Sequence, residues 1–225
     1  EVAYKGGYGK AIFYRQLLEY KKNRFFIFGF YTLVCLCIGI GIGILGYMEK
    51  IGGYGEFVIL GVMAYLTFMF SGYSGKWGKE LKKPYTYLIP DTALSKLWYA
   101  TLMEHIRSLI DGCLIALPAG IGLGISMVRI LLIIGVYICV QACKLYAEVM
   151  VEAFLGNLLG TAGKQYARVF FLGIIMMIGI MGAAAGTMVY SMEIGFLFLI
   201  GIIIFLTGGM MAIAAVNFER METVE

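Results

Sequence analysis

Six long runs of apolar residues constrain this chain more than any other feature. A helix needs about 20 apolar residues to cross the hydrocarbon core of a bilayer. The runs cover residues 25–47, 56–72, 97–126, 128–155, 169–190 and 194–216. With 61% hydrophobic and only 14% charged residues, the composition is not that of a soluble domain. We therefore predict an all-α membrane protein with six transmembrane helices.

Basic residues are divided unequally among the segments that join these runs. Most of them lie before the first run, between the second and third, between the fourth and fifth, and after the sixth. The opposite set of connections contains only Lys50 and Arg129. Because connections rich in Lys and Arg remain in the cytoplasm, both termini and residues 73–96 are expected on the cytoplasmic side.

Residues 10–25 have the pattern of an amphipathic helix that precedes the first span. Phe13, Leu17 and Tyr20 share one face of it, and basic residues surround that face. Such a helix is expected to lie in the membrane interface. The alternative is a cytoplasmic extension of the first span.

The insert at residues 73–96 is polar and lies between two apolar runs. Its "KWGKELKK" stretch predicts a short basic helix that ends at Pro84, and Asp91 is a good N-cap for the third span. This shape suits docking onto a soluble partner, and the alternative is an ordinary solvated loop. The candidate contact residues are Lys76, Trp77, Lys79, Glu80, Lys82, Lys83, Tyr85 and Tyr87.

Charged side chains form stripes on the third and fourth spans. Arg107 and Asp111 share a face of the third span, and Lys144 and Glu148 share a face of the fourth. Folding the two spans about a tight turn predicts the ion pairs Asp111–Lys144 and Arg107–Glu148. Two interpretations stay open, because intramembrane charges usually pair or face water. They fasten the two helices together, or they line a transport vestibule that faces the cytoplasm.

Sequence motifs for catalysis are missing. The stretch "GNLLGTAGKQ" fails the spacing of a phosphate-binding loop, and neither HExxH nor GxSxG occurs. The chain has a single histidine, His105, which is either a polar interfacial residue or part of a proton relay. Cys139 and Cys143 are read as buried hydrophobic residues rather than metal ligands. We expect no enzyme activity, cofactor, metal or nucleic-acid partner for this chain.

The order of elements resembles that of ABC-2-type exporter permeases. Within the insert, Glu80, Lys82–Lys83, "YLIP" at Tyr87–Pro90 and Ser95–Lys96 carry this likeness. More narrowly, "KAIFYRQLLEYKKNRFFIF" and "KPYTYLIPDTALSKLWYATL" resemble the bacterial group called putative ABC exporters. Members of that group can contain two six-span halves, and the chain begins with Glu1, so it is expected to represent one half.

The resemblance implies a function, a membrane and a set of partners. The chain would be a single permease domain in the bacterial cytoplasmic membrane that exports an amphipathic or hydrophobic peptide, lipid or drug-like substrate by alternating access. Cytoplasmic ABC ATPase subunits carrying ATP and Mg²⁺ would bind the insert, and a second six-span bundle would complete the route. Membrane lipid is a further expected partner.

Aromatic and methionine side chains are the candidates for contact with substrate. Core packing or lipid contact is the alternative for them. The residues are Tyr31, Tyr65, Phe68, Met176 and Met177. Two other functions compete with export, namely ion-coupled secondary transport through Asp111 and Lys144, and a membrane assembly or sensor subunit that transports nothing.

Overall fold

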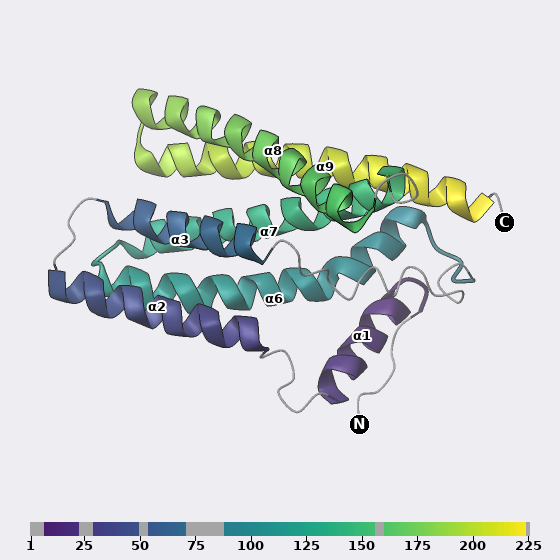
Figure 1. Ribbon diagram of the computed structural model, residues 1–225, viewed down its shortest axis with the longest axis horizontal. Coiled ribbons are helices and arrows are strands. Elements are labelled where there is room, and N and C mark those ends of the chain that lie inside the picture. Colours follow the sequence, from purple (N-terminus) through teal and green to yellow (C-terminus); the bar gives the residue numbers. More distant parts are fainter. Residues whose placement is uncertain (1–6, 23–28, 50–53, 71–87, 156–159, 224–225) are drawn as a thin grey trace.

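The computed structural model describes residues 7–22, 29–49, 54–70, 88–155 and 160–223. Within these ranges the chain forms seven α-helices and no strand (Figure 1). In chain order they are α1 (Lys10–Lys22), α2 (Phe30–Glu49), α3 (Gly55–Met69), α6 (Ala93–Gly122), α7 (Met127–Leu155), α8 (Thr161–Val189) and α9 (Met192–Thr223). The predicted all-α architecture is confirmed for the described part of the chain.

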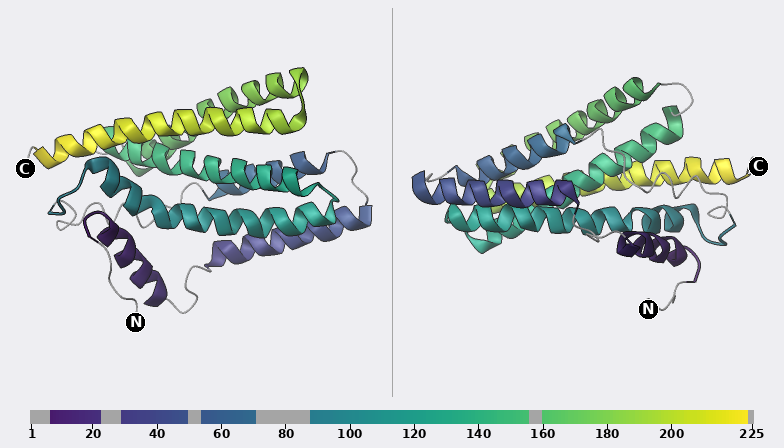
Figure 2. Two further views of the ribbon diagram at one scale, coloured as in Figure 1. Left: turned by 180° about the vertical axis from the view of Figure 1, so that it is seen from behind. Right: turned by 60° about the horizontal axis from the view of Figure 1, so that its bottom comes forward.

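The long helices lie side by side, and α6 and α7 form the centre of the bundle (Figures 1 and 2). α2 packs along α6, α3 contacts both α6 and α7, and α8 and α9 pack on α7 and on each other. α1 lies crosswise beside the first turns of α6, at the same end of the bundle as the C-terminal end of α9. The core is therefore centred on these two helices, where residues such as Ile115 and Ile133 are fully buried, and the other helices pack onto it.

Four helical segments are long and apolar enough to cross a membrane. They are Phe30–Met48, Met127–Glu152, Thr161–Val189 and Met192–Val216, and they match the first, fourth, fifth and sixth predicted spans. α3 is a shorter apolar helix of 15 residues, and the 30-residue α6 carries several charged side chains. The count of six spans and their orientation in a membrane stay predictions.

The N-cap predicted for the third span is wrong by one residue. α6 begins at Ala93, and Thr92 is its N-cap, with a side-chain oxygen that accepts from the Ser95 N–H at 3.3 Å. Asp91 instead accepts the Thr92 N–H through Oδ1 at 2.8 Å, and its Oδ2 is used for a contact with the N-terminal segment. The sequence could not show that second contact, because it joins residues that lie far apart in the chain.

The helix that carries the predicted fifth span extends beyond its start at Val169, because α8 already begins at Thr161. The preceding segment looked like a polar connection because it contains two basic residues. In the structure Lys164 pairs with Glu152 of α7 at 3.1 Å, so part of this segment is helical and packed on α7 rather than free in solvent.

Glycines allow α2 to approach α6 very closely. A Cβ atom placed on Gly39 would lie 2.5 Å from the Leu114 carbonyl oxygen, and one on Gly43 would lie 2.5 Å from the Pro118 carbonyl oxygen. Pro118 has no N–H, so the Leu114 carbonyl lacks its normal helical donor. The backbone of α2 therefore packs directly over the point where the hydrogen bonding of α6 is interrupted.

The "GAAAG" step in α8 packs within this bundle. Gly182 faces Ile202 of α9, and a Cβ atom on Gly186 would lie 2.9 Å from Phe198 of the same helix. Both glycines of this step therefore contact side chains of α9 within the same bundle. α8 and α9 thus form a tight pair on one side of α7.

The turn between α6 and α7 depends on one glycine. Gly124 has a φ of 68° and follows the C-cap Leu123. The Ile125 N–H donates to the Gly120 carbonyl at 2.9 Å, and the Gly124 N–H donates to the Ile121 carbonyl at 3.1 Å. This is a Schellman ending, in which the left-handed residue is usually glycine because other residues are strained there. It fixes the hairpin that brings the two charged stripes face to face.

Candidate functional site

A polar cavity of about 330 Å³ lies among α2, α6, α7 and the C-terminal end of α3. The two charged stripes line it from opposite sides, and aromatic side chains from α2, α7 and the end of α3 complete its lining. Its charged lining residues are Glu104, Arg107, Asp111, Lys144 and Glu148. Because a tight turn joins α6 to α7, the two helices pack side by side and their ionisable side chains meet in this cavity.

The ion pairs in this cavity differ from the predicted ones. Arg107 Nε lies 3.8 Å from Asp111 Oδ2 on the same helix, whereas Glu148 pairs with Arg168 of α8 at 3.1 Å. The predicted pairs Asp111–Lys144 and Arg107–Glu148 are replaced because the cavity separates the two stripes. The prediction matched the levels of the charges along the helices, but it had no information on the space between them.

Lys144 binds the backbone end of α3 instead of a carboxylate. Its Nζ donates to the Phe70 carbonyl oxygen at 2.8 Å. Phe70 is the C-cap of α3, where helical carbonyls lack intrahelical donors and the helix dipole favours a cation. Lys144 therefore joins α7 to the point at which the chain leaves α3 and enters the insert.

Aromatic side chains form one wall of the cavity. The hydroxyl groups of Tyr31 and Tyr137 lie 3.0 Å apart, and Tyr31 makes an edge contact with Phe70 at a centroid distance of 4.8 Å. The Arg107 guanidinium lies 5.9 Å from the centre of the Tyr31 ring. Tyr31, predicted as a possible substrate contact, therefore lines the cavity beside a charged residue.

The other predicted substrate contacts are dispersed. Tyr65, Phe68 and Met177 are exposed on the outside of the bundle. Met176 lines a second space, an apolar groove of about 550 Å³ formed by α3, α7, α8 and α9. The five residues thus do not form one surface within this bundle.

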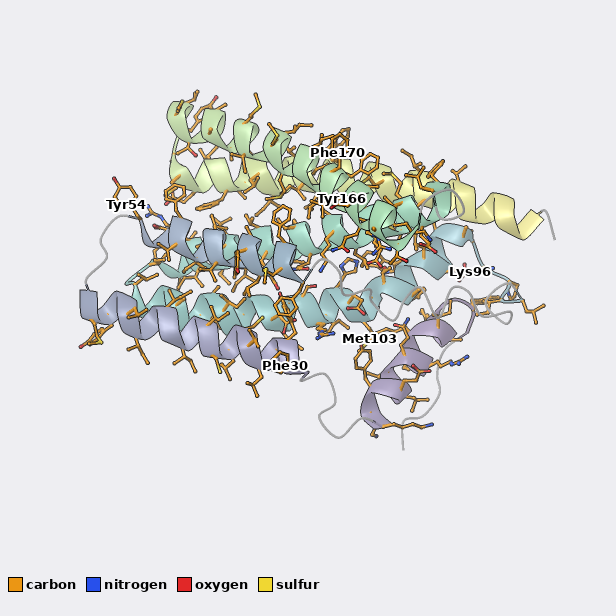
Figure 3. The ribbon with its side chains drawn as sticks, viewed as in Figure 1. Phe30, Tyr54, Lys96, Met103, Tyr166 and Phe170 are labelled. Carbon is orange, nitrogen blue, oxygen red and sulfur yellow. The ribbon has the colours of Figure 1, made fainter. Side chains whose placement is uncertain are left out.

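The residues predicted to contact a soluble partner lie outside the described residues. This holds for Lys76, Trp77, Lys79, Glu80, Lys82, Lys83, Tyr85 and Tyr87. The end of the insert is described from Leu88 onward, and it runs into α6 past the buried Lys96. Figure 3 shows Lys96 at the end of the bundle opposite Tyr54.

Asp91 fastens the N-terminal segment to the start of α6. Its Oδ2 accepts the Gly9 N–H at 2.9 Å and the Ser95 hydroxyl at 2.8 Å. Desolvation by itself raises the pKa of Asp91, but the hydrogen bonds from Ser95, Gly9 and Thr92 outweigh it and hold the pKa below its ordinary value. The carboxylate form is therefore the one that makes this joint.

α1 is docked on α6 through a buried stripe. Tyr20, which was predicted on the apolar face, is buried together with Ile12 and Gln16. The Gln16 side-chain amide donates to the Ala100 carbonyl oxygen at 2.9 Å. Because a buried amide must be hydrogen-bonded, this contact fixes the register of α1 on α6. Its place in a membrane interface stays a prediction.

His105 lies on α6 beside the cavity. One ring nitrogen is 3.2 Å from the Tyr146 hydroxyl oxygen, which is also 3.1 Å from the Thr101 hydroxyl. The imidazole lies against the Trp98 ring at a centroid distance of 5.5 Å, with the two rings tilted by 32°. These contacts give His105 a fixed position between α6 and α7. Among the described residues, no group of three or more His, Cys, Asp or Glu side chains is placed to hold a metal ion.

An arginine bridge at the opposite end of the bundle was not predicted. Arg129 of α7 donates to Glu56 of α3 at 3.0 Å and to Glu193 of α9 at 2.8 Å. Each of these residues lies in the first turn of its helix. Isolated charges at the same end of three apolar runs were the available signal, and the bridge holds three helices together there.

Comparison with known proteins gives one match. Residues 2–222 match the model of a family described as "Putative ABC exporter". Searches of curated proteins and of solved structures found no match. The family match covers nearly the whole chain and agrees with the bundle of apolar helices, so the protein is a multi-pass membrane protein and a component of membrane transport. The chain belongs to the putative ABC exporter family.

Proposed function

We propose that this protein is the permease subunit of an ATP-driven exporter in the bacterial cytoplasmic membrane. It would have an ABC-2-type architecture with six spans and with both ends in the cytoplasm. Separate ATPase subunits, which bind ATP and Mg²⁺, would dock on the insert at residues 73–96. A second six-span bundle, whether a copy, a relative or a fused half, would complete the complex. Family membership supports the transport role and the association with ATPases.

The observation that carries the proposal is the joint between α1 and α6. Asp91, at the end of the insert, binds Gly9 directly, and Gln16 binds the Ala100 carbonyl oxygen. α1 and the first turns of α6 are thus coupled through two hydrogen bonds between distant segments. A force applied to the insert would move both helices together, as coupling to a cytoplasmic motor requires.

The cargo is proposed to be amphipathic. Charged groups line the cavity near this joint, whereas the groove beyond it is almost entirely apolar. A molecule with a polar part and an apolar part matches both surfaces. Efflux of such a molecule would then occur by alternating access between two bundles.

Copurification tests this function. The intact complex is purified from membranes in mild detergent, and its ATP hydrolysis is measured with and without the triple change Glu80→Ala, Lys82→Ala, Lys83→Ala. We expect an ATPase to copurify and the triple variant to release or uncouple it. The change Lys50→Ala, in a connection predicted on the other side of the membrane, is the control. Failure to recover any ATPase with the unchanged protein would refute the proposal.

Ion-coupled secondary transport is the second candidate, favoured by Asp111. This carboxyl group is only 2% exposed, and its Oδ1 has no hydrogen-bond partner within the described part of the chain. Buried ionisable groups in membrane proteins often mark ion pathways. Transport that follows a proton or sodium gradient and persists without ATP would favour this candidate over the exporter.

A further inference from the structure

The polar cavity and the apolar groove are separated by one layer of side chains. Tyr137 lines both spaces. Next to it, Gln141 lines the cavity and donates to the hydroxyl oxygen of Thr67, which lines the groove, at 2.9 Å. The two spaces are thus neighbours within a single bundle, and the side chains of Tyr137, Gln141 and Thr67 lie between them.

The cavity offers charges of both signs and has unsatisfied polar atoms. Arg107 Nε and Asp111 Oδ1 are buried without a hydrogen-bond partner among the described residues, and the two side chains approach only to 3.8 Å. A buried polar group that lacks a partner is costly. A ligand that carries both a cationic and an anionic group would satisfy the carboxylate and the guanidinium together, which neither a simple cation nor a simple anion does.

The groove offers a long apolar surface that an alkyl chain is able to follow. It extends along α3 from Phe57 to Thr67, ten residues apart, which corresponds to about 15 Å of helix. The Thr67 and Thr187 hydroxyl groups donate to carbonyl oxygens of their own helices, so they present little polarity to the groove. Met176 and Met188 are among its flexible apolar lining residues.

The groove is open at one edge. Its lining includes Met188, which is 87% exposed, and Phe57, which is 58% exposed. In a bilayer this edge faces hydrocarbon or a second protein. An alkyl chain is therefore able to enter sideways, without crossing the polar cavity.

We propose that the cavity and the groove form one two-compartment site, within a single bundle, for a single-chain amphiphile with a zwitterionic headgroup. The headgroup lies in the cavity against Arg107 and Asp111, with its anionic group toward the guanidinium and its cationic group toward the carboxylate, and the alkyl chain lies along α3 and α8. Tyr137, Gln141 and Thr67 form the partition that the chain crosses. This inference rests on the proposed export function, and it names the class of cargo and the place where one bundle holds it.

Photolabelling tests the site in the full chain, purified with its bound partners and reconstituted in nanodiscs. The probe is dodecylphosphocholine with a diazirine at the chain end, and labelled residues are located by mass spectrometry. Labelling is expected on groove residues such as Met188 and Met192. Unlabelled dodecylphosphocholine is expected to compete about tenfold better than dodecyl phosphate or dodecyltrimethylammonium, the effect of one lost charged contact. Equal competition by all three would overturn headgroup recognition.

Two neighbouring alanines provide matched variants. Ala184 lines the groove, whereas the adjacent Ala185 is exposed and belongs to neither lining. Ala184→Trp is expected to abolish groove labelling, and Ala185→Trp is expected to leave it unchanged. Similar labelling in the two variants would overturn the assignment of the chain to the groove. If two copies crosslink through Ala184→Cys, the groove is occupied by a second bundle. That result would also overturn the assignment of the alkyl chain to the groove.

The labelling needs neither ATP nor transport, so its outcome is separate from that of the copurification. Loss of groove labelling in a complex that still contains an active ATPase refutes only the two-compartment site. Groove labelling with zwitterion preference in a protein that never recovers an ATPase supports the site and refutes the ATP-driven mechanism.

Discussion

The close contact between α2 and α6 gives a prediction with a built-in control. Gly39 and Gly41 lie on the same helix, but only Gly39 faces α6. A Cβ atom on Gly39 would lie 2.5 Å from the Leu114 carbonyl oxygen and 2.9 Å from the Ile115 Cα atom, whereas one on Gly41 would meet nothing within 4 Å. The changes Gly39→Ala and Gly41→Ala therefore differ in their packing against α6. Both changes gain the same helix propensity.

The size of the effect follows from the distances. A carbon atom approaches a carbonyl oxygen without repulsion at about 3.3 Å, so Gly39→Ala would push α2 outward by about 0.8 Å. A gap of that size removes about a quarter to a half of the dispersion energy at each affected contact. Overpacking of this kind costs about 1–3 kcal/mol. The cavity wall would move as well, because Tyr31 lies on α2.

Thermal unfolding followed by far-ultraviolet circular dichroism measures the difference. Gly39→Ala is expected to unfold about 2–12 °C below Gly41→Ala, since 1 kcal/mol corresponds to about 2–4 °C for a chain of this length. Gly41→Ala should be at least as stable as the parent, because alanine is the better helix former. Equal midpoints for the two variants would show that the backbones do not touch at Gly39.

Three other contacts give further predictions. Because the pKa of Asp91 lies below its ordinary value, the ionised group stabilises the joint at neutral pH, and this stability is lost as the pH falls through the lowered pKa. Amide hydrogen exchange of α1 should therefore be faster in the Asp91→Asn variant than in the parent protein at neutral pH. In strong acid, where both proteins lack the carboxylate, the two exchange rates should be equal. Gly124→Val should lower stability by about 1–2 kcal/mol in chemical or thermal unfolding, and Gly124→Asn by less, because only small polar residues tolerate positive φ. Arg168→Met should destabilise more than Arg168→Met combined with Glu148→Met, since the single change leaves a buried carboxylate without its 3.1 Å partner. Equal midpoints in the last comparison would contradict a stabilising role for this pair.

Local patterns in the sequence were sufficient to predict the helices. Apolar runs, basic connections and the capping residues before Ala93 are properties of neighbouring residues, and they located each long helix to within about five residues except at the start of α8 and the end of α9. That start was missed because Lys164 and Arg168 look like part of a polar connection until their partners Glu152 and Glu148 are placed beside them. Charge alone does not distinguish a solvated segment from a paired one.

Predicting the site in full would have required the distances between helices, and the sequence does not contain them. The stripes predicted that Arg107, Asp111, Lys144 and Glu148 would face one another, and all four do line the cavity. The stripes could not show that a cavity separates them or that Lys144 binds a backbone carbonyl. The arginine bridge at Arg129 joins three helices, so no pattern within one segment could show it.

The position of Lys144 connects the cavity to the insert. Its ammonium group holds the last carbonyl of α3, from which the insert begins, and one turn further along α7 lies Glu148, which pairs with α8. A displacement of the insert that broke the contact with Phe70 would leave the half-buried ammonium group of Lys144 without its hydrogen-bond acceptor. Because an unpaired buried charge is unfavourable, the cavity would then favour a ligand or a helix movement that restores a partner. Lys144 thus contacts both the backbone end of α3, which the insert follows in the chain, and the cavity.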